Sequence, residues 1–167
     1  GSTINNDVLN YTLSTSATSR SDVGTYEVYA NYTNKNYEIF FEKGEYIITP
    51  RQVNIQIYNQ TSVYGNPINL NKTSSYRVVS GLISGDELGV NLRSDANYRS
   101  NVGSYKITAE INNDNYKLKY TEGTLEITKR EIMIRLLDQS VPYSFNLKTD
   151  DSAYKVVSGT ILDGDYL

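Results

Sequence analysis

Acidic side chains are the groups in this sequence that could bind a metal. Asp150, Asp151, Asp163 and Asp165 lie close together in the chain, and oxygen ligands of this kind suit Ca²⁺. The related segment about 79 residues earlier keeps only one such acid, Asp86. A structural calcium site that belonged to a repeat would repeat its ligands. We therefore interpret these acids as solvated loop residues, and we predict no metal site and no cofactor.

The sequence offers little for catalysis. It contains no His and no Cys, which excludes imidazole general bases, thiol nucleophiles and Ser-His-Asp triads. Glycoside hydrolysis needs two acids that face one cleft, yet each copy of the repeat keeps one acid in common, Asp86 in the first and Asp165 in the second. Each follows a Gly, which is typical of a turn. Arg20 and Arg99 occupy the same position in the two copies, each before a Ser. We interpret them as residues that anchor a loop. We predict that the chain is not an enzyme.

Tyrosine is the abundant aromatic residue, with 16 copies in 167 residues. Tyrosine rings on an exposed strand face could stack against sugars. The candidates for glycan stacking are Tyr29 and Tyr98. Neither recurs, because their counterparts 79 residues away are Thr108 and Ser19, so a glycan site shared by the two copies is not indicated.

Charge and hydropathy exclude two classes of partner. The 16 basic and 19 acidic residues give a net charge of −3, whereas a nucleic-acid-binding domain carries a basic patch that meets the phosphates. No run of 18 apolar residues occurs, so no segment is long enough to cross a bilayer as a helix. We predict no nucleic-acid partner and no membrane insertion of this segment.

An internal repeat of 79 residues is the strongest pattern. The sequence SDVGTY at 21–26 returns as SNVGSY at 100–105, and 15 of the 39 positions between Leu13 and Arg51 are identical to the residues 79 positions on. Two folding units, 3–88 and 89–167, are the simplest interpretation. The alternative phase is one central unit, 51–129, flanked by two half-units, which would leave strand edges unpaired.

The apolar residues alternate with a period of two, which predicts strands. The pattern runs through 26–32, 37–41, 46–48, 53–57 and 76–79 and returns one period later. We therefore expect a mainly β protein of two tandem repeats, each with about six short strands in a small sheet or sandwich. Thr49-Pro50 and Thr128-Lys129 join strands with no loop, so we expect semi-rigid junctions and an elongated molecule.

Several short motifs occur in a characteristic order. They are Ile-Thr-Pro-Arg at 48–51, Val63-Tyr64-Gly65, Val79-Ser80-Gly81-Leu82, Gly85-Asp86, Asn101-Val102-Gly103-Ser104-Tyr105, Asn115-Tyr116 and Gly123-Thr124-Leu125-Glu126-Ile127-Thr128. This order resembles the MBG-type repeats, including the variant marked by Tyr-Gly, that occur in tandem in large bacterial cell-surface adhesins. The second copy departs from it, with Val141-Pro142-Tyr143-Ser144 in place of 63–65.

The resemblance implies an extracellular protein of the bacterial cell surface, anchored to the wall or envelope through other regions. It also implies β-grasp-like modules and no catalytic residues. We predict a non-catalytic tandem-repeat module that acts as a semi-rigid stalk or spacer and contacts neighbouring repeats of the same polypeptide. The alternative is a module that itself binds host mucin-type glycans or host surface proteins.

Overall fold

The computed structural model describes residues 3–4 and 7–166. The protein is mainly β, with 42% of its residues in strands against 3% in helix, which confirms the predicted fold class. Leu167, the end of the predicted second unit, lies outside the described residues. The strands are β1 (Tyr11–Thr15), β2 (Gly24–Tyr32), β3 (Gly44–Ile48), β4 (Arg51–Ile57), β5 (Gln60–Val63), β6 (Tyr76–Ser80), β7 (Asn91–Arg93), β8 (Gly103–Glu110), β9 (Tyr116–Thr121), β10 (Gly123–Thr128), β11 (Met133–Leu136) and β12 (Tyr154–Ser158).

Residue contacts divide the chain into two compact units. Unit 1 comprises residues 1–55, 78–90 and 111–119, and unit 2 comprises 56–77, 91–110 and 120–167. Each unit is therefore assembled from segments that are far apart in the sequence. The division into folding units at 3–88 and 89–167, and its alternative at 51–129, stay predictions.

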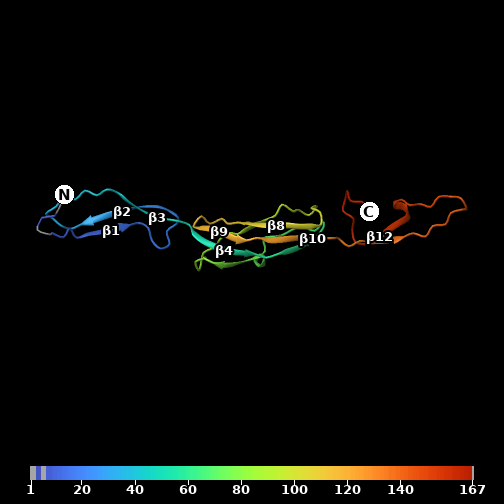
Figure 1. Cartoon of the computed structure of the whole chain (residues 1–167), viewed down its shortest axis with the longest axis horizontal. Helices are drawn as coiled ribbons and strands as arrows, with labels where there is room; N and C mark the ends of the chain where they lie inside the picture. Colours follow the sequence, from blue (N-terminus) through green and yellow to red (C-terminus); the bar gives the residue numbers. More distant parts are fainter. Residues whose placement is uncertain (1–2, 5–6, 167) are drawn as a thin grey trace. The chain divides into compact units, whose positions relative to one another are not determined.

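Unit 1 contains an antiparallel sheet in the order β1-β2-β3, which can be followed in Figure 1. Its registers set Leu13 opposite Ala30 and Tyr26 opposite Tyr46. The apolar side chains of β2 point to one face, where Val28 and Ala30 are half-buried. The buried apolar side chains of unit 1 lie in its other segments: Val53, Ile55, Leu88 and Tyr116.

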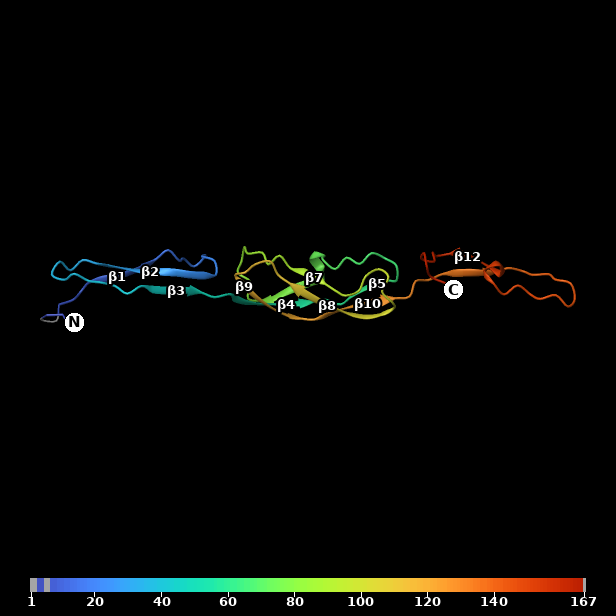
Figure 2. The same ribbon diagram turned by 90° about the horizontal axis from the view of Figure 1, so that it is seen from above.

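Unit 2 contains a four-stranded sheet in the order β5-β10-β8-β7. All four strands are labelled in Figure 2. Strand β10 is central, because it pairs with β8 antiparallel on one side and with β5 parallel on the other. Its inward residues Leu125 and Ile127 are almost completely buried. They pack with the other buried apolar residues of the unit: Ile57, Leu70, Leu92, Ile107 and Ala109.

Two smaller sheets complete the fold. Strands β6, β4 and β9 form a three-stranded sheet in that order. Strands β11 and β12 form an antiparallel pair with an irregularity between Met133 and Ile134. Short 3₁₀ helices, η1 (Thr73–Ser75) and η2 (Asp151–Ala153), precede β6 and β12.

The predicted alternation is confirmed in β4, where Val53, Ile55 and Ile57 are all buried. The counterparts of the last two, Ile134 and Leu136 in β11, have the same pattern but are 43% and 74% exposed. The segment 37–41 was likewise predicted as a strand and is irregular, although its counterpart forms β9. The physical reason is the partner strand: β9 lies next to β4 in its sheet, whereas no described strand pairs with 37–41.

One isoleucine of each copy provides a direct test of this difference in burial. Ile55→Ala removes a side chain that is 1% exposed and should lower the free energy of unfolding by about 2–5 kcal/mol. Ile134→Ala alters the equivalent position, and at 43% exposure it should cost less than about 1 kcal/mol. Urea unfolding followed by far-ultraviolet circular dichroism measures both. Equal losses would contradict the burial described here.

Two glycines at positive φ differ in what surrounds them. Gly81 has φ +93°, and a Cβ there would come within 2.2 Å of the backbone oxygen of Gln52. Gly85 has φ +91° and open space around the same position. Gly85→Ala should therefore cost about 1–2 kcal/mol for its backbone conformation alone.

Gly81→Ala should cost about 2–5 kcal/mol, because a steric clash of about 1–3 kcal/mol adds to the same backbone term. Urea midpoints of the two variants make the comparison. A Gly81→Ala variant as stable as Gly85→Ala would show that the loop after β6 is free to move away from β4.

Candidate functional site

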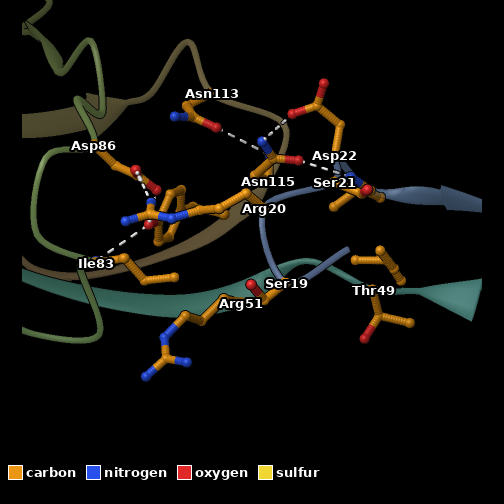
Figure 3. A pocket seen from close by; sticks show the side chains of 13 residues that line it. Ser19, Arg20, Ser21, Asp22, Thr49, Arg51, Ile83, Asp86, Asn113 and Asn115 are labelled. Atoms are coloured by element: carbon orange, nitrogen blue, oxygen red, sulfur yellow. Dashed lines mark hydrogen bonds and ion pairs between the residues drawn. The ribbon is translucent and has the colours of Figure 1, made fainter. Parts of the chain in front are cut away.

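A hollow in unit 1 gathers polar side chains from four stretches of chain (Figure 3). They are the loop 19–23 before β2, the connection 48–51 between β3 and β4, the loop around Ile83 to Asp86, and residues 113–116 at the start of β9. Both repeated residues predicted as structural, Arg20 and Asp86, lie here. We take this hollow as the candidate site because polar side chains from all four stretches line it.

Asp86 is bound through both carboxylate oxygens. Its Oδ1 accepts a hydrogen bond from Arg20 Nη1 at 2.9 Å, and its Oδ2 accepts one from the Tyr116 hydroxyl at 2.5 Å. The Arg20 side chain is 62% exposed, so the ion pair contributes about 0–1 kcal/mol. Its effect is to orient the loop that carries Arg20 rather than to hold the unit together.

Tyr116 is the buried member of the cluster. Its hydroxyl oxygen also accepts a hydrogen bond from the backbone N–H of Ile83 at 3.2 Å. Burial raises the pKa of Tyr116, and the hydrogen bond to the Asp86 carboxylate raises it further. The phenol therefore stays protonated near neutral pH and acts as a fixed donor to Asp86.

Asn115 joins three stretches of the chain. Its side-chain Oδ1 accepts from the backbone N–H of Val23 at 2.7 Å, and its Nδ2 donates to Asp22 Oδ1 at 2.7 Å. Its backbone oxygen accepts from the N–H of Arg51 at 2.9 Å. Asn115 thus links the loop before β2 to the start of β4. Figure 3 shows its hydrogen bond to Asp22 as a dashed line.

The Arg–Asp ion pair recurs in unit 2. Arg99 and Asp165 are the residues 79 positions after Arg20 and Asp86, and their side chains lie 3.6 Å apart. Asp165 also accepts a hydrogen bond from the Tyr64 hydroxyl at 3.1 Å. In both units one aspartate, Asp86 or Asp165, is bound by an arginine and by a tyrosine hydroxyl. Such an arrangement holds loops together.

The carboxylates of this hollow and of the loop before β12 are bound by groups of the protein itself. The two carboxylates of the hollow, Asp22 and Asp86, both face donors of the protein itself. Asp150 accepts from the N–H and hydroxyl of Ser152, which lowers its pKa. Among the described residues, no group of three or more acidic side chains could hold a metal ion.

The two predicted glycan-stacking residues belong to different units. Tyr29 lies on β2, is 54% exposed, and donates through its hydroxyl to Glu27 at 2.8 Å, which raises its pKa. Tyr98 is 53% exposed in unit 2, with the guanidinium carbon of Arg99 5.7 Å from its ring centroid. Their role in glycan binding stays a prediction.

Sequence reasoning missed the pairing of Arg20 with Asp86. Asp86 was interpreted as a turn residue, and it does lie in a turn, since its N–H donates to the Ile83 oxygen at 3.1 Å. The available signal was that the arginine and the aspartate recur with the same spacing of 79 residues. Residues that recur together often make the same contact in each copy.

The Tyr-Gly turn after β5 explains the departure in the second copy. Gly65 has φ +83°, and a Cβ there would lie 2.4 Å from Leu162. Ser144, its counterpart, adopts φ +73° without being a glycine. The turn conformation is therefore kept, at the cost of a side chain in the left-handed region.

Comparisons with known proteins agree with this architecture. Residues 53–126 match the model of the MBG domain (YGX type) family, which indicates a repeat module of surface proteins. No curated protein matches the chain. Among the described residues, no helix is long and apolar enough to span a membrane. The segment from β4 to β10, with Tyr64-Gly65 in its turn, is thus an MBG-type domain of the YGX variety.

Proposed function

We propose that this chain is a non-catalytic repeat module of a bacterial surface adhesin and acts as a semi-rigid spacer that presents an adhesive region. The observation that carries the proposal is the recurrence of the Arg–Asp ion pair, Arg20 with Asp86 in unit 1 and Arg99 with Asp165 in unit 2. An enzyme would concentrate its unusual contacts in one site. A spacer repeats them along the chain.

The connection between β3 and β4 supports a stiff spacer, because only Thr49 and Pro50 separate the two strands. The direct junction predicted at Thr128-Lys129 is wrong, since residues 129–132 separate β10 from β11. Pro50 has a fixed φ, and Asn115 binds Arg51, directly after the β3–β4 connection, through its backbone oxygen and Val23 through its side-chain oxygen. Flexible linkers are rich in Gly and Ser and lack such contacts.

Small-angle X-ray scattering tests the spacer function. Chains lengthened stepwise by further copies of residues 51–129 should increase in maximum dimension by a constant increment for each added copy. A matched variant with six Gly-Ser residues inserted between Thr49 and Pro50 should broaden the distance distribution, because it removes the stiff connection. A lengthened chain whose radius of gyration grows only as that of a compact globule would contradict the proposal.

A second candidate function is direct binding of glycans in unit 2. Residues 67–71 and residues from 92 to 98, at the end of β7 and after it, line a hollow. Tyr98, Asn69 and Arg93 are among its lining residues. Exposed tyrosine rings beside amide and guanidinium groups suit sugar recognition. This hollow supports the predicted role of Tyr98 better than the open face of β2 supports that of Tyr29.

A mucin-type glycan array separates the two candidates. If unit 2 binds glycans, Tyr98→Ala should lower the signal at least tenfold, and Tyr29→Ala, the matched control on β2, should leave it unchanged. Signal that survives both substitutions would exclude these tyrosines. No signal with the unaltered chain would favour the spacer function alone.

A further inference from the structure

The sheet in unit 1 and the β11–β12 pair in unit 2 each expose a face that is buried in the MBG-type domain. Strand β3 corresponds to β10, but Tyr46 is 54% exposed where Leu125 is 1% exposed. Strand β11 corresponds to the end of β4, but Leu136 is 74% exposed where Ile57 is 2% exposed. Phe41, Leu13 and Val141 are also exposed.

The strands that are absent follow one rule. In the MBG-type domain, β5 has β10 as its neighbour, and β9 has β4. The counterparts of β5 and β9, residues 139–142 and 37–42, form no strand. The counterparts of β10 and β4 do form strands, β3 and β11, because each keeps a neighbour, β2 or β12, from its own part of the chain. The segments that form no strand are those whose neighbour would come from the other end of the chain: β3 for residues 139–142, and β11 for residues 37–42.

We propose that the N-terminal segment 9–48 of one copy binds the C-terminal segment 131–166 of a second copy of this chain, and that together they complete an MBG-type domain. In this arrangement residues 139–142 of one copy pair in parallel with β3 of the other, as β5 pairs with β10. Residues 37–42 pair with β11, as β9 pairs with β4. The partner is a second copy because the strands equivalent to both segments already pair with each other in the MBG-type domain of this same chain.

The register follows from the central domain. Thr61 lies opposite Glu126 in the β5–β10 pair. Moving each residue by 79 positions sets Ser140 of one copy opposite Ile47 of the other. Ile47 is 63% exposed, and both positions correspond to exposed residues of the central sheet, so cysteines there would not disturb a core.

Charge predicts how salt affects the association. Residues 9–48 contain three basic and five acidic side chains, and residues 131–166 contain three basic and six acidic side chains, so the two partners carry net charges of −2 and −3. Salt screens the repulsion between the two negatively charged segments, but it does not weaken the burial of apolar side chains between them. Association should therefore strengthen as the salt concentration rises.

Cysteine cross-linking tests the proposal, since the chain contains no cysteine of its own. Ile47→Cys and Ser140→Cys variants, mixed and oxidised with diamide, should give a disulfide-linked heterodimer at least tenfold faster than Thr12→Cys mixed with Ser140→Cys. Thr12 lies on β1, at the opposite edge of the same sheet. Thr61→Cys combined with Glu126→Cys is the internal control and should close within one chain.

Each outcome decides the matter. Equal cross-linking at Thr12 would show unspecific contact and overturn the proposal, and so would an absence of heterodimer when the internal control closes. An Ile47→Cys, Ser140→Cys double variant that closes within single chains would also overturn it, because the two segments would then bind each other within one copy.

Sedimentation velocity of the unaltered chain provides a second readout. The mass should rise with protein concentration and with salt, and Leu136→Lys should raise the dissociation constant at least tenfold while the central domain unfolds at the same urea concentration. A chain that stays monomeric at millimolar concentration in high salt would overturn the proposal.

Discussion

The parallel pairing of β5 with β10 is the interaction on which the rest of the structure depends. It sets Gln60 opposite Leu125, residues separated by 65 positions, and parallel strands cannot be joined by a short turn. With β8 on its other edge, β10 has both edges covered, and its inward residues reach almost complete burial. Strand β3 has the same alternation but only one neighbour, so its side chains stay exposed.

The polar contacts are arranged around the ends of this pairing. The Tyr64-Gly65 turn follows β5, and the Arg130 guanidinium that follows β10 donates to the Tyr64 oxygen at 2.9 Å. Asp165 then binds both Tyr64 and Arg99. These exposed contacts contribute little free energy individually, but their recurrence around Asp86 fixes the direction in which each loop leaves its sheet.

The sequence predicts the local part of this structure well. Alternation in 53–57 identified β4 and its inward residues, because the period of two is a property of the strand itself. It could not predict that 37–41 is irregular, since the same alternation occurs there and in β9. Alternation shows which face of a segment is apolar, whereas strand formation also requires a neighbour. That neighbour comes from a distant part of the chain.

The candidate site shows the same limit. Arg20 and Asp86 were both recognised as recurrent, but neither the ion pair between them nor the buried hydroxyl of Tyr116 follows from spacing alone. Contacts between residues 66 positions apart depend on the pairing of strands. The second copy has Ser144 where the first has Gly65, yet Ser144, with a φ of +73°, keeps the conformation of Gly65. The surrounding strands evidently determine this turn more strongly than its own residue does.

Hydrogen exchange of backbone amides, measured on the dilute chain, tests the central claim that a neighbour from a distant part of the chain decides which segments become strands. Amides of β5 and β9 should exchange slowly, near the limit set by global unfolding of the MBG-type domain. Those of 139–142 and 37–42, which have the equivalent places in the repeat, should exchange almost as fast as in an unfolded peptide. Equal protection of all four segments would contradict the account.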